Sequence, residues 1–215
     1  MSRTLRAVQR GLEQMYRVTT GVAVEDFMVG DAARAALSPT RRPREQLLVC
    51  EVGGEMELAL FLDPSAIANL AQRDPAHRLD EHNVGDFLLA LEGVSHFVYT
   101  VVCAQRERSV SALELELQAE VDKYVTCLLI SEDGGDLAQR SAYWRHRLFV
   151  NCEYHDDLDA DERDRYRAAN DNALRYTGML QARFVASGQI PAMLAEVRRF
   201  YRRGLAEKLA CAAAA

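Results

Sequence analysis

Hydrophobic and polar positions divide the chain into a mixed N-terminal part and a helical remainder. Apolar residues recur every three or four positions over Arg3–Val18, which predicts an amphipathic helix with an arginine-rich outer face. The segment 22–29, VAVEDFMV, alternates and predicts a short strand, whereas residues 32–44 are predicted to form a connection. This part of the chain therefore mixes helix and strand.

The clearest strand signal is a pair of apolar runs, 46–52 and 55–62, that meet at Gly53-Gly54. Two glycines permit the positive backbone angles of a tight turn, so the runs are predicted to form an antiparallel hairpin. Leucines and a methionine alternate with other residues in the second run, so one face of the hairpin is expected to be buried. Residues 66–72 are predicted as a short helix.

From Asn83 onward the pattern is strongly helical. The predicted helices cover 83–104 with Asn83 as N-cap, 111–130, 137–150, 160–186 and 190–209. Strand and helix are segregated along the chain, so the predicted class is α+β and helix-dominated. An N-terminal helix and a small antiparallel hairpin precede a bundle of about five helices. We expect a single domain over 1–215, with an α/β part at 1–80 and a helical part at 83–210.

Composition indicates a soluble globular protein, with 49% hydrophobic residues, 27% charged residues and a formal net charge of -6. Five cysteines without CxxC spacing indicate reduced thiols and a cytoplasmic location. Lys123 and Lys208 are the only lysines among 26 basic residues, an arginine bias that indicates a GC-rich bacterial genome. The apolar segment 87–104 approaches the roughly 20 residues of a membrane span. Its polar residues favour a core helix instead, so no membrane association is expected.

Candidate chemistry centres on Glu92, the sole formal charge in 87–104, and on His96 one turn later. An antiparallel neighbouring helix 111–130 would bring Glu116 and Glu120 toward them. Carboxylates with one imidazole suit Mg, Mn, Fe or Zn, so the predicted ligands of a divalent metal are Glu92, His96, Glu116 and Glu120. The predicted catalytic residues are Glu92, His96, Glu120 and Lys123.

Such a site would bind a small phosphorylated ligand and would be hydrolytic if catalytic, because a bound metal activates water and holds phosphate oxygens. Without a metal, Glu92 and His96 could act as general acid and base. Glycine-rich phosphate loops, nucleophile elbows and His-Glu-x-x-His are absent from the sequence, which argues against the common nucleotide-binding, hydrolase and zinc-protease classes.

Two other interpretations remain open. The polar residues could be structural, with Glu116 and Glu120 paired to Lys123, in a non-enzymatic interaction or regulatory protein that binds another protein. The arginine-rich C-terminal helices could contact RNA, but acidic residues alternate with the arginines and the chain is acidic overall, so nucleic acid is not expected.

A weaker candidate lies in the polar loop around His155, next to Asp156 and Asp157. A solvated connection is the favoured interpretation of this loop, with Asp159 or Asp161 as the cap of the following helix.

Overall fold

The computed structural model describes residues 2–38, 43–130, 136–151 and 159–215. These residues form nine α-helices and one two-stranded antiparallel sheet, which confirms the helix-dominated α+β class. They divide into two compact units, one of Met1–Gln14 and Val18–Val102, the other of Met15–Arg17 and Cys103–Ala215. The boundary after Val102 lies near the end of the long apolar helix, so most of this helix belongs to the first unit. The expectation of one domain stays a prediction, and each unit is described by itself.

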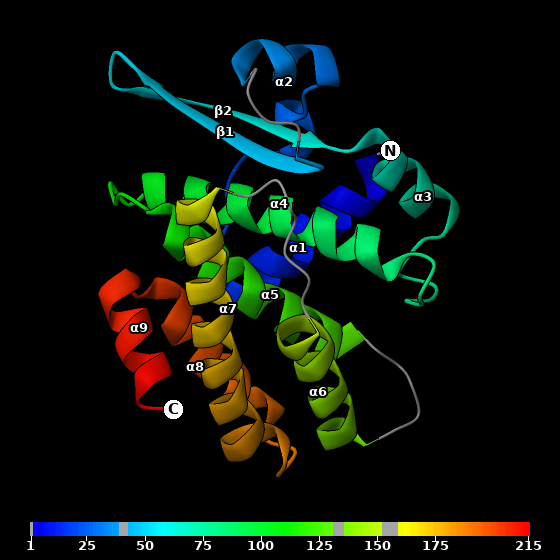
Figure 1. The fold of residues 1–215 in the computed structure, drawn as a ribbon, viewed down its shortest axis with the longest axis vertical. Helices are drawn as coiled ribbons and strands as arrows, with labels where there is room; N and C mark the ends of the chain where they lie inside the picture. Colours follow the sequence, from blue (N-terminus) through cyan, green and yellow to red (C-terminus); the bar gives the residue numbers. More distant parts are fainter. Residues whose placement is uncertain (1, 39–42, 131–135, 152–158) are drawn as a thin grey trace. The chain divides into compact units, whose positions relative to one another are not determined.

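The first unit contains the hairpin and the helices around it (Figure 1). Its elements are most of α1 (Ser2–Tyr16), the 3-10 turn η1 (Val24–Phe27), α2 (Asp31–Leu37), β1 (Glu45–Val52), β2 (Glu55–Leu62), α3 (Pro64–Gln72) and α4 (Val84–Ala104) up to Val102.

The hairpin forms as the sequence predicts (Figure 1). Gly53 and Gly54 take φ values of 62° and 86°, a region that side chains with a Cβ disfavour, and they close the turn. The register places Leu47 opposite Leu60. Leu60 and Leu62 are buried, so the expected buried face exists at the base of the hairpin.

Two predictions for the segment before the hairpin are wrong. Residues 22–29 do not form a strand, because the side chain of Gln9 accepts the Val24 N–H at 2.9 Å and donates to the Val22 carbonyl at 2.7 Å. These backbone groups are thereby satisfied without a strand partner, and Met28 alone forms a bridge to β2. Residues 31–37 form α2 rather than a connection, and 39–42 lie outside the described residues.

Arg34 explains why α2 stays against the hairpin. Its side chain is 1% exposed, its guanidinium lies 4.7 Å from the centre of the Phe61 ring, and it donates to Asp31 at 2.7 Å. A guanidinium over an aromatic face is attractive, and the contact covers the hairpin face on the side of Phe61.

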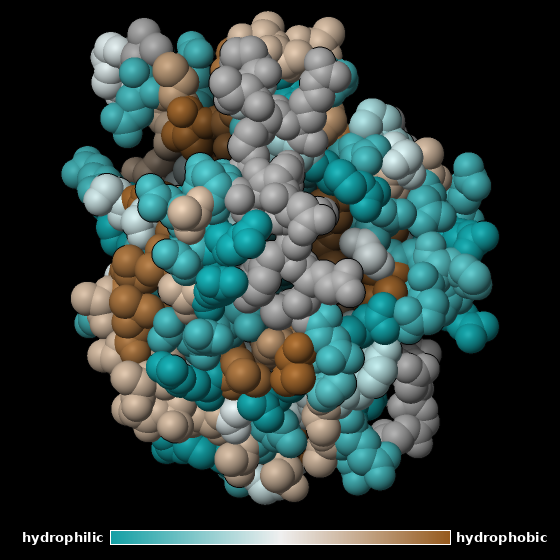
Figure 2. Space-filling view, viewed as in Figure 1, coloured by the Kyte–Doolittle hydropathy of each residue, from teal (hydrophilic) through white to brown (hydrophobic). Residues whose placement is uncertain are grey.

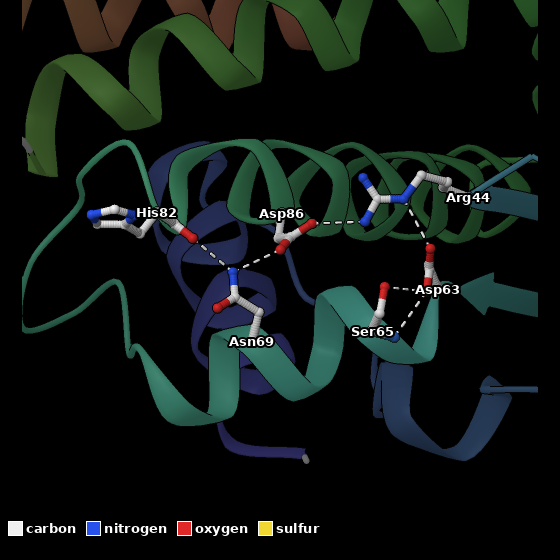
Figure 3. Close-up of polar contacts among 6 residues, drawn as sticks. All are labelled: Arg44, Asp63, Ser65, Asn69, His82 and Asp86. Atoms are coloured by element: carbon white, nitrogen blue, oxygen red, sulfur yellow. Dashed lines mark hydrogen bonds and ion pairs between the residues drawn. The ribbon is translucent and has the colours of Figure 1, made fainter.

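A polar network joins the base of the hairpin to α3 and α4 (Figure 3). Arg44 donates to Asp63 at 2.9 Å and to Asp86 at 2.8 Å, and Asn69 also donates to Asp86 at 2.8 Å. Asp63 caps α3 by accepting the Ser65 N–H. The hydrogen bond from Arg44 is the largest cause that lowers the pKa of Asp63 to about 2. The network fixes where β1 begins relative to α4.

Asn83 takes the expected N-cap position of α4, since it directly precedes Val84 and its carbonyl accepts the Phe87 N–H at 2.8 Å. Its side-chain oxygen accepts the Asp80 N–H at 2.9 Å, and its amide donates to the carbonyls of Arg73 and Arg78. The side chain of Asn83 therefore closes the loop before α4.

The second unit is helical. Its elements are α5 (Ala112–Ile130), α6 (Leu137–Arg145), the π turn η2 (His146–Val150), α7 (Ala160–Leu180), the π turn η3 (Gln181–Val185), α8 (Ile190–Arg202) and α9 (Leu205–Ala213). Helix α5 packs against α7, which also contacts α9.

The single helix expected over 190–209 is two helices, since the chain is extended at Arg203 and Gly204. Asp159 caps α7 as expected, whereas His155, Asp156 and Asp157 lie outside the described residues.

Helix α4 is the one described helix that is long and apolar enough to cross a membrane, and 72% of its most apolar window is buried. Ser95 and Tyr99 on its polar side are also buried, which confirms that this side does not face bulk water. On the face shown in Figure 2, hydrophobic residues form small patches among hydrophilic ones. Small patches of this kind are ordinary on protein surfaces.

Replacing Gly93 in α4 with alanine should destabilise the protein. The new Cβ would lie 3.0 Å from Glu45 Cγ and 3.0 Å from Leu62 Cδ2, so two hairpin side chains would have to move. We expect a loss of about 1–3 kcal/mol in the free energy of unfolding, measured by denaturant titration. Gly11→Ala in α1 is the control, because nothing lies within 4 Å of its added Cβ. It should gain up to about 1 kcal/mol, and equal gains in both variants would contradict the close packing of hairpin and helix.

Candidate functional site

Glu92 and His96 occupy the middle of α4, one helical turn apart. Each offers a metal-ligating atom, and the two atoms lie within 4.8 Å of one another. His96 is buried and Glu92 is half-buried. The structure therefore brings together the two residues that the sequence analysis placed at the centre of the site.

Glu45, the first residue of β1, adds a second carboxylate to this pair. Its Oε1 lies 3.5 Å from Nδ1 of His96, and the two side chains are 9% and 7% exposed. Gly93 makes the approach possible, because the Glu45 side chain occupies space that any Cβ on residue 93 would enter. The hairpin thus delivers a carboxylate to the imidazole across the one glycine in the middle of α4.

The distance between Glu45 Oε1 and His96 Nδ1 can be compared with that of a hydrogen bond and with that of two ligands of one metal ion. A distance of 3.5 Å is longer than an ordinary N–H···O hydrogen bond. Two ligand atoms bound to one tetrahedral metal by bonds of about 2.1 Å stand about 3.4 Å apart. The Oε1–Nδ1 pair therefore has the spacing of adjacent ligands around one cation.

The other predicted site residues lie on α5, in the second unit. Glu116 is buried. Glu120 forms an ion pair with Lys123 at 2.7 Å, which confirms the expected helical pairing for these two residues. The convergence of Glu116 and Glu120 on Glu92 and His96 stays a prediction, as does a catalytic role for Lys123.

The second unit also contains a buried polar network that sequence reasoning missed. Lys208 of α9 is 0% exposed and donates to the side-chain oxygen of Gln118 on α5. Gln118 in turn donates to Asp122 at 2.8 Å, and the Tyr16 hydroxyl donates to the same carboxylate oxygen. The ring of Phe200 lies 4.7 Å from the Lys208 amine. These contacts hold α9 and the last turn of α1 against α5.

Burial shifts the pKa values of two residues in this network. It lowers the pKa of Lys208 from its ordinary 10.5 to about 7, a fall that Glu114 and Asp122 oppose through their negative charges. Burial and the neighbouring Asp122 raise the pKa of Tyr16 well above its usual value. The Lys208 amine therefore loses its proton more readily than an exposed lysine, while Tyr16 keeps its proton at neutral pH.

Weak sequence signals existed for both missed residues. Glu45 begins the first hairpin strand, and Gly93 interrupts an otherwise apolar helix, which indicates that another part of the chain approaches closely there. Lys208 lies in an alanine-rich apolar stretch and is one of two lysines. Neither signal identifies its partner, because both contacts join segments far apart in the sequence.

Comparison with protein-family models, curated proteins and solved structures gives no match to this chain. A function is therefore inferred from its own residues.

The network around Lys208 predicts a pH dependence. The folded-state pKa of about 7 is below the ordinary 10.5, so between these values the unfolded chain binds more protons than the folded one. The free energy of unfolding should then rise as pH increases above 7. We expect Lys208→Met to reduce this rise over pH 7–8.5, measured by urea titration. An identical pH slope in both proteins would contradict a depressed pKa of Lys208.

Proposed function

We propose that the protein binds a divalent first-row metal ion on α4 through His96, Glu92 and Glu45. The spacing of Glu45 Oε1 and His96 Nδ1, 3.5 Å between two nearly buried side chains, carries this proposal. The donor set of two carboxylates and one imidazole suits Zn²⁺, Mn²⁺ or Fe²⁺.

Electrostatics favour a cation at this position. Removing a carboxylate from water is unfavourable unless a positive charge or hydrogen bonds compensate it. Glu45 and Glu92 together supply two negative charges beside one imidazole, and the imidazole is neutral when it binds a metal. A divalent ion matches in magnitude the two negative charges of these carboxylates.

Three protein ligands leave coordination positions for water and substrate. Catalytic metal sites have this composition, because the ion lowers the pKa of bound water to about 7 and polarises a phosphoryl oxygen. We propose that the site hydrolyses a small phosphorylated molecule. A purely structural pairing of Glu45 with His96 is the rival interpretation, and the experiments below separate the two.

Thermal unfolding with Zn²⁺, Mn²⁺, Mg²⁺ or EDTA tests the metal site. A ligand present at 100 times its Kd contributes about 2.7 kcal/mol, which corresponds to a Tm increase of about 5–10 °C for a chain of this size. His96→Ala, Glu92→Gln and Glu45→Gln should each abolish the increase. Glu57→Gln, on an exposed strand position, is the control and should retain it.

The same titration on Glu116→Gln and Glu120→Gln tests whether α5 supplies further ligands. A metal-dependent Tm increase that survives in His96→Ala would contradict the proposed centre. The lack of any metal-dependent Tm increase in the unmodified protein would also contradict it. A protein that loses stability in Glu45→Gln without responding to any metal would support the structural interpretation.

Release of inorganic phosphate from a panel of phosphomonoesters and pyrophosphates tests the reaction class. Even outer-shell partners of a bound metal are worth about 10- to 100-fold in activity, so we expect His96→Ala to lose at least about 100-fold. EDTA should abolish the activity, and added metal should restore it. Phosphate release that is unaffected by both EDTA and His96→Ala would contradict hydrolysis at this centre.

A further inference from the structure

The three arginines of α8 and Arg203, which follows the helix, divide into two pairs with different partners. Arg199 and Arg203 share one carboxylate, that of Glu196, at 2.5 and 3.8 Å. Arg198 and Arg202 instead donate to backbone carbonyls at the end of α1, those of Met15 at 2.7 Å and Tyr16 at 3.2 Å. The second pair therefore lies directly beside the residue that follows Tyr16.

That residue is Arg17, which places a third guanidinium group at the end of α1. Its φ is 53°, the left-handed conformation that usually belongs to glycine at the end of a helix. An arginine in this conformation costs roughly 1–2 kcal/mol of stability. The chain thus keeps a cation at a position where glycine would be more stable.

The charge of this cluster, Arg17 with Arg198 and Arg202, is not balanced by carboxylates. In the described part of the chain none of the three forms an ion pair. Partial burial, followed by repulsion from Arg17 and Arg202, lowers the pKa of Arg198, although an arginine remains protonated at neutral pH. The carbonyl end of a helix contributes roughly half a negative charge, so the three guanidinium groups leave a net positive charge of about 2.5.

We propose that Arg17, Arg198 and Arg202 form a binding site for a phosphate group of a small molecule. Guanidinium groups bind phosphate oxygens through paired N–H donors. The two amino groups of Arg198 and the whole Arg17 side chain remain available, since Arg198 uses only its Nε on the Met15 carbonyl. A phosphate dianion matches the remaining charge. This site lies in the second unit and does not depend on the proposed metal centre.

Calorimetric titration with inorganic phosphate at low ionic strength, and with pyrophosphate in parallel, tests the site. Arg17→Asn is the informative variant, because asparagine tolerates the left-handed conformation and leaves the hydrogen bonds of Arg198 and Arg202 in place. We expect at least about tenfold weaker phosphate binding, since one charged hydrogen bond is worth about 1.5–3 kcal/mol. The stability of the variant should be equal to that of the unmodified protein or higher.

Arg199→Gln is the matched control, because it removes an arginine of the same helix that is already paired with Glu196. It should bind phosphate within about twofold of the unmodified protein. Equal affinity for phosphate in Arg17→Asn and in the unmodified protein would overturn the proposal. A calorimetric response to chloride that equals the response to phosphate at matched ionic strength would also overturn it. Tighter binding of an RNA oligonucleotide than of pyrophosphate, with steep salt dependence, would also overturn a small-molecule site.

Discussion

The contact of Glu45 with α4 across Gly93 fixes how the hairpin lies on this helix. It brings the first residue of β1 to 3.5 Å from His96, deep in a helix that is buried on almost every side. Arg44, the preceding residue, is held by Asp63 and Asp86, so the strand cannot slide along the helix. Because strand register is set in steps of one residue, a shift would turn Glu45 away from the imidazole. The position of the hairpin and the approach of Glu45 to His96 therefore depend on the same contacts.

The second unit places its charges differently. Its central polar residues, Lys208, Gln118 and Asp122, form a continuous hydrogen-bonded network. Such a network satisfies buried polar groups but leaves the Lys208 amine with a strongly lowered pKa. In the same unit, Arg17, Arg198 and Arg202 form no ion pair with any described residue. Buried charge is compensated internally, whereas the arginine cluster around Arg17 retains charge for an external anion.

Sequence patterns predicted the class, the hairpin and the long helices, because these elements follow from local periodicity and from glycine at the turn. They failed at residues 22–29, where the distant side chain of Gln9 satisfies the backbone, and at α2, which Arg34 holds through Phe61. Glu92 and His96 were predicted as neighbours because their spacing is helical. Glu45 was not, since its contact is set by how the hairpin lies on α4. The pairing of Glu120 with Lys123 was again local and therefore predictable.

The central claim is that Glu45 and His96 are spaced by a shared cation. Anomalous diffraction from crystals grown with Zn²⁺, recorded on both sides of the metal absorption edge, tests it most directly. The account predicts one peak about 2.0–2.2 Å from a ring nitrogen of His96 and from a carboxylate oxygen of Glu45. A map without a peak at this position, with Nδ1 of His96 at direct hydrogen-bond distance from Glu45, would contradict it.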